Sequence, residues 1–337
     1  MKKILTMGLF CIAGYVNAAA PCLTSTSTLP SVDSVYKSGK FRIYYNSNPA
    51  NENYLVDRTD LNSNGIPDYV ENMAIQANAT TEALTHLGFT HPLESNRYKG
   101  VAQYIDIHLI KQTGNGVAYE MAQNFVNKAI KEGKCSLTIH IRNNLNDFPG
   151  DYVQGSPENY WTIATHEIFH LYQYGSNQFK GGWYLEGMTY LMERLLREGS
   201  QGGSGLTKLP ASQAQMESAV YTVPFNQLWH RLAVLSDNSN GQLNLPSELL
   251  NRRYIDGSKV FKDEKLKGHM FIKKALENME LKTDHLSAIN GWDKHNWAEA
   301  NQISPLNRPH MLKVIQETMY QFGMNKTQEE KDFLKLY

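Results

Sequence analysis

The sequence has little cysteine, no excess of either charge and, beyond its first 20 residues, no long hydrophobic run. It contains three cysteines in 337 residues, and its 33 basic side chains balance 33 acidic ones. Because no block of lysine or arginine stands out, we expect no nucleic-acid partner. No later stretch approaches the length that crosses a bilayer, so we also expect no membrane span. The length suits one core, or one domain with two lobes.

Residues 1–20 have the pattern of a secretory signal peptide. Lys2 and Lys3 precede a short apolar run, and Val16 and Ala18 suit positions −3 and −1 of a cleavage site. The apolar run is too short to span a bilayer comfortably, although an N-terminal anchor helix is the alternative. We therefore predict an exported protein, either secreted or periplasmic, and we expect it to be a monomer.

Removal of the signal peptide leaves two cysteines, Cys22 and Cys135. Two cysteines in an exported chain can pair, and we expect a disulfide between them. The alternative is two unpaired thiols. A bridge would tie the mature N-terminus to a site shortly before the segment that carries the strongest chemical pattern.

That segment, residues 166–198, begins with His-Glu-Ile-Phe-His. His166 and His170 are four residues apart, so both project from one face of a helix. Two imidazoles in this arrangement can hold a tetrahedral zinc ion, and Glu186 on the next apolar stretch can supply a third ligand. Glu167 can reach a metal-bound water without ligating the metal. Two His, one Glu and an open position predict a hydrolytic zinc centre; a coincidental helix is the alternative.

The motif His-Glu-x-x-His followed by Trp-x-x-Glu-Gly resembles the gluzincin zinc peptidases, whose third ligand is a Glu on a second helix. Residues 186–193 are similar to the corresponding helix of the zinc aminopeptidases. The resemblance implies His166, His170 and Glu186 as ligands and Glu167 as the general base. Leu185 stands where the aminopeptidase motif has Asn, and the Gly-x-Met-x-Asn exopeptidase motif is not visible. We therefore expect an endopeptidase.

Residues 60–71 match the spacing of a twelve-residue calcium loop, with Gly65 at the tight turn. Its predicted ligands are Asp60, Asn62, Asn64, Ile66 through its carbonyl, Asp68 and Glu71. Pro67 is unlike an ordinary EF-hand and is similar to the loops of thrombospondin type 3 repeats. We predict a structural calcium ion of modest affinity, because two of the side-chain ligands are neutral; an Asx-rich turn without an ion is the alternative.

The two motifs together resemble a family of secreted bacterial metallopeptidases over roughly residues 40–235. This resemblance supports peptidase chemistry and leaves the substrate undefined. It also implies a zincin-like architecture for the catalytic part of the chain.

The order of expected elements indicates an α+β fold. Strands are expected at 41–45, 104–110 and 136–141, and a helix at 70–88. The expected divisions are a signal peptide at 1–20, an extended arm at 21–40, a catalytic lobe at 41–210 and a helical lobe at 211–337. In zincins an edge strand aligns the substrate, and the strand at 136–141, with His140, is a candidate for that role; a core or solvent-facing His140 is the stronger reading.

Four further residues are candidates for supporting roles. Gln173, three after His170, and Glu193, seven after Glu186, lie on the ligand faces and can hydrogen-bond the imidazoles; solvated helix positions are the alternative. Gluzincins stabilise the oxyanion with a downstream Tyr or His, so Tyr221 and His230 are the candidates here, with Tyr221 preferred. Either can instead be a packed aromatic.

The predicted function is a secreted zinc endopeptidase that acts on a protein or peptide substrate, glycosylated substrates included. The alternative from another class is a calcium-stabilised adhesin or glycan-binding domain with a vestigial zinc site. The intact Glu167 argues against that alternative, since a binding protein has no use for a general base.

Overall fold

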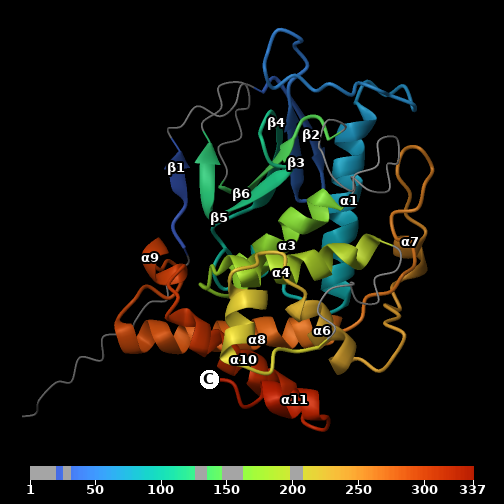
Figure 1. The fold of residues 1–337 in the computed structure, drawn as a ribbon. Helices are drawn as coiled ribbons and strands as arrows, with labels where there is room; N and C mark the ends of the chain where they lie inside the picture. The colour runs from blue at the N-terminus through green and yellow to red at the C-terminus, as the bar shows by residue number, and fades with distance from the viewer. Residues whose placement is uncertain (1–19, 26–31, 126–134, 146–161, 198–207) are drawn as a thin grey trace, which may run out of the picture.

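The structure is a computed structural model, and it describes residues 20–25, 32–125, 135–145, 162–197 and 208–337 (Figure 1). The expected α+β class is confirmed: a six-stranded mixed sheet occupies the N-terminal part, and the C-terminal part is mainly helical. Residues 1–19 of the predicted signal peptide fall outside the described residues. Within the described chain, no helix has the length and apolar character needed to cross a membrane.

The sheet has the strand order β1-β5-β6-β4-β3-β2. The strands are β1 (Leu23–Ser25), β2 (Ser34–Ser38), β3 (Phe41–Tyr45), β4 (Tyr104–Ile110), β5 (Gly116–Phe125) and β6 (Ser136–Arg142). The pairs β3–β4, β4–β6 and β1–β5 are parallel, whereas β2–β3 and β5–β6 are antiparallel. The central strands β4 and β6 are rich in Ile and Leu, which suits strands that are covered on both faces.

Helices make up much of the remaining described chain. They are α1 (Asp68–His86), η1 (Pro92–Glu94), α3 (Ile163–Ser176), α4 (Gly182–Met192), η2 (Glu193–Leu196), α5 (Gln213–Met216), η3 (Glu217–Tyr221), α6 (Leu228–Ser236), α7 (Ser247–Leu250), α8 (His269–Asn290), α9 (Glu299–Gln302), α10 (Asn307–Gln321) and α11 (Gln328–Phe333). The helices α1 and α3 pack against the sheet. Asp68 and Glu71 in the first turn of α1 suit the positive end of the helix dipole. The helix ends before Gly88, whose φ of 83° favours glycine.

The helix α3 lies at the centre of the molecule, with the sheet on one side and the C-terminal helices on the other (Figure 1). It contacts α1, β5, β6, α4 and α8. Twelve of its 14 residues are buried. The polar side chains on this helix are therefore held in place by the residues packed around them, and few of them contact solvent.

The sequence predicts an extended arm at residues 21–40, and the described part of this segment contains two strands. This segment supplies β1, which pairs with β5, and β2, which forms a hairpin with β3. Gly39, with a φ of 58°, provides the tight turn of that hairpin. The Ser- and Thr-rich composition obscured the alternation of these short strands, although Gly39-Lys40 between two alternating runs was a usable hairpin signal. The strand β5 was also missed, because Gly114 and Gly116 flank its start and its register shifts after Tyr119.

Cys22 and Cys135 are joined by a disulfide with a Cα–Cα distance of 6.1 Å. The bridge connects the residue before β1 to the residue before β6 across 113 positions of sequence. Since β1 is only three residues long, this link helps to hold the short strand against the edge of the sheet. A disulfide is typical of proteins that fold in an oxidising, extracytoplasmic compartment.

Candidate metal centre

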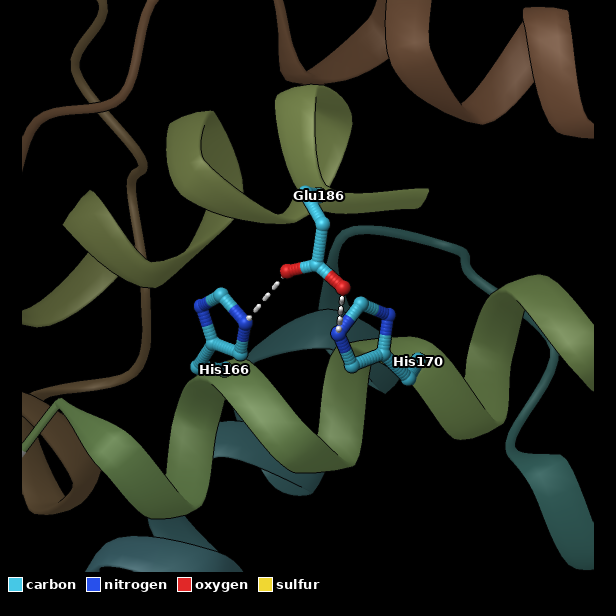
Figure 2. Close-up of side chains that lie close together, drawn as sticks. All are labelled: His166, His170 and Glu186. Carbon is cyan, nitrogen blue, oxygen red and sulfur yellow. Dashed lines mark hydrogen bonds and ion pairs between the residues drawn. The ribbon is translucent and has the colours of Figure 1, made fainter. Parts of the chain in front are cut away.

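Two adjacent helices present the predicted ligand residues to one another. His166 and His170 project from α3, and Glu186 projects from α4, which packs across it (Figure 2). Gly187 leaves room on α4 for Asn226 from the segment before α6, because a Cβ there would lie 2.7 Å from the side-chain nitrogen of Asn226. That same amide donates to the Trp183 carbonyl at 2.7 Å, which fixes the first turn of α4.

The three side chains converge on one point. Glu186 Oε2 lies 3.3 Å from His166 Nε2, and Glu186 Oε1 lies 3.6 Å from His170 Nε2. The three ligand atoms lie within 4.8 Å of one another. Two ligands of a tetrahedral zinc ion, each at its usual bond length, are about 3.3 Å apart. The spacing therefore fits a metal ion, and among the described residues this is the cluster of His, Cys, Asp and Glu that can hold one.

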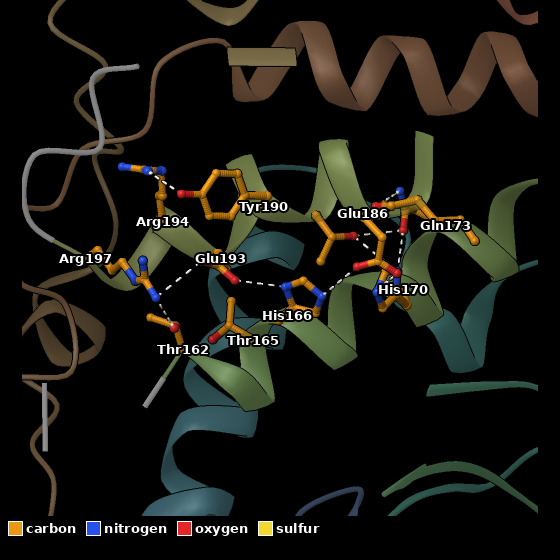
Figure 3. A network of polar contacts seen from close by, with 12 residues as sticks. Thr162, Thr165, His166, His170, Gln173, Glu186, Tyr190, Glu193, Arg194 and Arg197 are labelled. Carbon is orange, nitrogen blue, oxygen red and sulfur yellow. Dashed lines mark hydrogen bonds and ion pairs between the residues drawn. The ribbon is translucent and has the colours of Figure 1, made fainter. Parts of the chain in front are cut away.

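A second layer of hydrogen bonds fixes both imidazoles (Figure 3). His166 Nδ1 donates to Glu193 Oε2 at 2.8 Å, and His170 Nδ1 donates to Gln173 Oε1 at 2.9 Å. Gln173 also accepts from Thr189 Oγ1 at 2.9 Å. With each Nδ1 satisfied by an acceptor, the neutral tautomer of each ring carries its lone pair on Nε2, the atom that faces Glu186. This tautomer is the one that metal binding requires.

The network continues away from the centre through Glu193. Its second oxygen lies 3.3 Å from Arg197 NH2, and the same NH2 donates to Thr162 Oγ1 at 2.9 Å (Figure 3). Glu193 is 5 % exposed, so its charge is balanced by two cations rather than by water. The chain thus places a buried carboxylate between a candidate metal ligand and a pocket-lining arginine.

The charged groups of the cluster shift the pKa values of one another. Burial alone would lower the pKa of His166, but hydrogen bonds to Glu186 and Glu193 and the charge of Glu167 outweigh burial and raise it to about 10. Burial would raise the pKa of Glu186, but the imidazoles of His166 and His170 outweigh it and hold the pKa far below its ordinary value. In the metal-free protein His166 is therefore an imidazolium. A metal ion would take the place of its Nε2 proton.

Glu167 is not part of this ion-pair network, but it lines the same cavity as the candidate ligands. It is 4 % exposed, and burial raises its pKa, while the charges of His166 and His170 act in the opposite direction. The backbone N–H of Ala118 on β5 donates to its carboxylate. Glu167 thus lies between the candidate metal ligands and the sheet.

A cavity of about 780 Å³ contains the candidate ligands and Glu167. Its walls come from β5, α3, α4, η2 and the segment before α6, and its lining residues are Asn115, Gly116, Val117, Ala118, Ile163, His166, Glu167, His170, Tyr174, Glu186, Tyr190, Glu193, Arg197 and Phe225. Val117 and Phe225 are both partly exposed apolar residues. The cavity has the size of a ligand site and joins a polar floor to apolar walls.

The lining does not include Tyr221 or His230, the two residues that the sequence offered as oxyanion donors. Tyr221 packs edge-on against Trp183, and Arg308 lies 4.8 Å from the centre of its ring, in a separate pocket. His230 is buried behind Tyr190, and burial lowers its pKa to about 3. Both are packed aromatics. Sequence order could not reveal this, because the surroundings of the two side chains depend on how η3 and α6 pack against the rest of the fold.

Two tyrosines that the sequence analysis missed line the cavity instead. Tyr190 follows Glu186 by four residues, and Tyr174 follows His170 by four, so each lies on the ligand face of its helix. Tyr190 OH accepts a long hydrogen bond from Arg194 NH2 at 3.5 Å. Burial raises the pKa of Tyr174 far above its ordinary value, which keeps its phenol protonated. Helical spacing from the ligands was the signal that could have found both.

The strand at 136–141 is not the edge strand that the sequence analysis proposed. As β6 it lies between β5 and β4, so both of its edges are paired. His140 lies on β6 with its Nδ1 3.3 Å from the hydroxyl of Tyr119, and it does not line the cavity. The strand beside the cavity is β5. On its outer side, β5 is paired with β1 only at residues 123–125, so within the described residues its first half has no strand next to it.

The predicted calcium loop folds around its own amides. Asp60 accepts from the N–H groups of Asn64 and Gly65 at 3.1 and 2.8 Å, and Glu71 accepts from the side-chain amides of Asn62 and Asn64 at 3.0 and 2.9 Å. Further contacts are Leu61 N–H to Asp68 at 3.1 Å and Ile66 N–H to Asn64 Oδ1 at 2.8 Å. The carboxylates of this loop do not form a cluster of the kind seen at His166.

Comparisons with protein-family models, with curated proteins and with solved structures gave no match to this chain. The fold and the cluster of His166, His170 and Glu186 are therefore what defines the molecule: an α+β protein with a site that can hold a metal ion.

Proposed function

We propose that this protein is an exported zinc-dependent endopeptidase. The observation that carries the proposal is the meeting, in one cavity, of a His-His-Glu cluster with metal spacing and a buried carboxylate that is not part of that cluster. A structural zinc site has four protein ligands and no free carboxylate beside it, whereas a hydrolytic site has three ligands and a base. The disulfide supports export.

In this proposal His166, His170 and Glu186 hold zinc. A zinc ion there supplies Lewis-acid chemistry: it polarises the substrate carbonyl and lowers the pKa of water. Glu167 accepts the proton of the attacking water and later delivers a proton to the leaving nitrogen. Burial supports this role, because a raised carboxyl pKa brings a base closer to the operating pH.

The phenols of Tyr190 and Tyr174 are the candidates to donate to the developing oxyanion. Both line the cavity, and both carry a hydroxyl that can donate a hydrogen bond. Tyr190 has the better support, because it lies one turn from Glu186 on the same helix and its OH accepts from Arg194, which leaves the phenol proton free to donate.

The shape of the cavity favours an extended polypeptide. The first half of β5 lines the cavity and leaves its outer edge without a neighbouring strand in the described part of the chain. Such an edge can accept a peptide by strand addition, and the exposed apolar side chains of Val117 and Phe225 line the same cavity. A glycan-binding domain, the alternative function, has no use for Glu167 as a base and gains no stability from burying its carboxylate.

We further propose that the loop at 60–71 binds calcium and stabilises the fold. Its support is the arrangement of Asp60, Asn62, Asn64, Asp68 and Glu71 around a turn at Gly65, whose φ is 86°. Burial raises the pKa of Asp68, and the charges of Asp60 and Glu71 add to that rise. A cation would relieve this repulsion, so calcium is expected to act on stability and not on chemistry.

The decisive experiment for the peptidase proposal compares wild type with Glu167→Gln on a denatured protein substrate, both loaded with zinc. Glu167→Gln keeps the size of the side chain and removes the base, so zinc content and folding should be retained while kcat falls by several orders of magnitude. Equal turnover in the two zinc-loaded proteins would sink the mechanism. An inactive wild type with full zinc would leave a metal-binding protein of another class.

A further inference from the structure

Gly116, the first residue of β5, faces the carboxylate of Glu167 at very short range. A Cβ built on Gly116 would lie 2.5 Å from Glu167 Oε1, 2.6 Å from its Cγ and 2.7 Å from its Cδ. Carbon atoms do not approach so closely, so any side chain at 116 collides with the carboxylate as it stands. The backbone of Gly116 has no positive φ, and glycine is therefore not needed there for conformation.

We propose that Gly116 is a positioning residue for Glu167. The absence of a side chain at this point of β5 creates the space that the carboxylate occupies, and the N–H of Ala118 holds the carboxylate in it. The inference rests on the proposed role of Glu167 as the general base. It adds a residue that positions this base, and that residue lies on a strand that the sequence does not connect with the His-Glu-x-x-His helix.

The surroundings decide which group moves when a methyl is added. Gly116 is paired with Ile141 on β6, and Ile141 is fully buried, so the strand cannot retreat. On the other side, Ile168 and Phe169 fix α3 in the core. The end of the Glu167 side chain is the flexible partner in the contact. Alanine at 116 should therefore displace the carboxylate by on the order of 1 Å while the fold and the metal ligands stay in place.

A neighbouring glycine supplies a matched control. A Cβ on Gly114 would have its nearest heavy atom, the Gly116 carbonyl oxygen, at 3.9 Å, which is an ordinary contact. Gly114→Ala thus makes the same chemical change two residues away, with no effect on Glu167. A comparison of Gly114→Ala with Gly116→Ala separates the collision with Glu167 from the general effect of replacing a glycine near the start of β5.

The experiment measures kcat, KM and zinc content for wild type, Gly116→Ala, Gly114→Ala, Glu167→Asp and the double variant Gly116→Ala/Glu167→Asp. We expect Gly116→Ala to bind zinc and melt like wild type, with kcat lower by about 100-fold and KM little changed. The shorter Asp withdraws the carboxylate from residue 116. Adding Gly116→Ala to Glu167→Asp should therefore cost about tenfold less than adding it to wild type. Gly114→Ala should match wild type.

A readout without turnover comes from the amide of Ala118. Glu167 accepts this N–H, so its hydrogen exchange in the zinc-loaded protein should rise by about tenfold or more in Gly116→Ala and stay unchanged in Gly114→Ala.

Wild-type kcat in Gly116→Ala, unchanged Ala118 exchange, an equal cost of Gly116→Ala in both backgrounds, or loss of folding in Gly116→Ala would each overturn the inference. Equal turnover of wild type and Glu167→Gln would instead overturn the proposed function, and the Ala118 exchange would still test whether Gly116 positions the carboxylate.

Discussion

The cluster of His166, His170 and Glu186 and the loop at 60–71 each match the ligand spacing of a metal motif, but their side chains are arranged differently in the structure. In the cluster, side chains from two helices converge, and partners such as Glu193 and Gln173 hold them from behind. In the loop, the oxygens bond amides of the same short segment. Ligand spacing is a local property of sequence. Convergence is imposed by neighbouring elements, and in the cluster the packing of α3 against α4 provides it.

The largest effect that sharpens this comparison is expected from Glu193→Gln. The substitution keeps the size of the side chain but removes the charge that faces both His166 and Arg197. Zinc affinity should fall by about 10- to 100-fold, because outer partners of a metal ligand fix its orientation and basicity. Competition with a chelator measures the change. Glu217→Gln, which breaks an exposed ion pair with Arg308, is the control and should leave zinc affinity unaltered; equal affinities in all three proteins would contradict the account.

The second expected effect is a pH dependence confined to the metal-free protein. Burial by itself would lower the folded-state pKa of His166, but the carboxylates of Glu186 and Glu193 outweigh burial and raise this pKa to about 10. A group with a raised pKa contributes stability that is complete below its unfolded pKa, about 6.5, and is lost as the pH rises toward the folded value. The free energy of unfolding of chelator-treated protein should therefore decline between about pH 6.5 and pH 10.

Zinc-loaded protein should lack this decline, because the metal replaces the proton at Nε2. Denaturant unfolding at several pH values, with and without zinc, gives the comparison. Metal-free His166→Ala should also lose the decline. If the metal-free wild type is equally stable across this pH range, the ion-pair description of the cluster is wrong.

The smallest effect is expected from the loop. Calcium that binds only the folded state adds about 2.7 kcal/mol of stability at a hundredfold excess over Kd. Glu71→Ala should remove most of the calcium response of the melting temperature, and it should leave zinc content and kcat unchanged. Melting curves at fixed zinc, with and without calcium, test this. An identical calcium response in wild type and Glu71→Ala would show that the loop is only a turn.

The sequence anticipated elements with strong periodicity and clear ends. Apolar patterns with few interruptions made three elements predictable: the strands at 41–45 and 104–110 and the helix that ends before Gly88. The convergence of His166, His170 and Glu186 was likewise predictable, since helical spacing and one further carboxylate nearly determine it. The strand β5 was not predictable, because its polar residues and shifted register hide the alternation.

The residues around the ligands were harder to assign for a different reason. Tyr221 was favoured on its order along the chain, and its actual direction depends on how η3 packs against Trp183 and Arg308. The contact between Gly116 and Glu167 joins two elements about 50 residues apart in sequence, and no local pattern encodes it. Contacts of this kind are set by the whole fold.

The central claim is that His166, His170 and Glu186 hold zinc, and elemental analysis tests it most directly. Wild type, His166→Ala/His170→Ala and Glu71→Ala are dialysed against zinc, freed of excess metal and analysed per folded chain. We predict about one zinc per chain in wild type and in Glu71→Ala, and almost none in the double histidine variant. Stoichiometric zinc in the double variant, or none in wild type, would contradict the account.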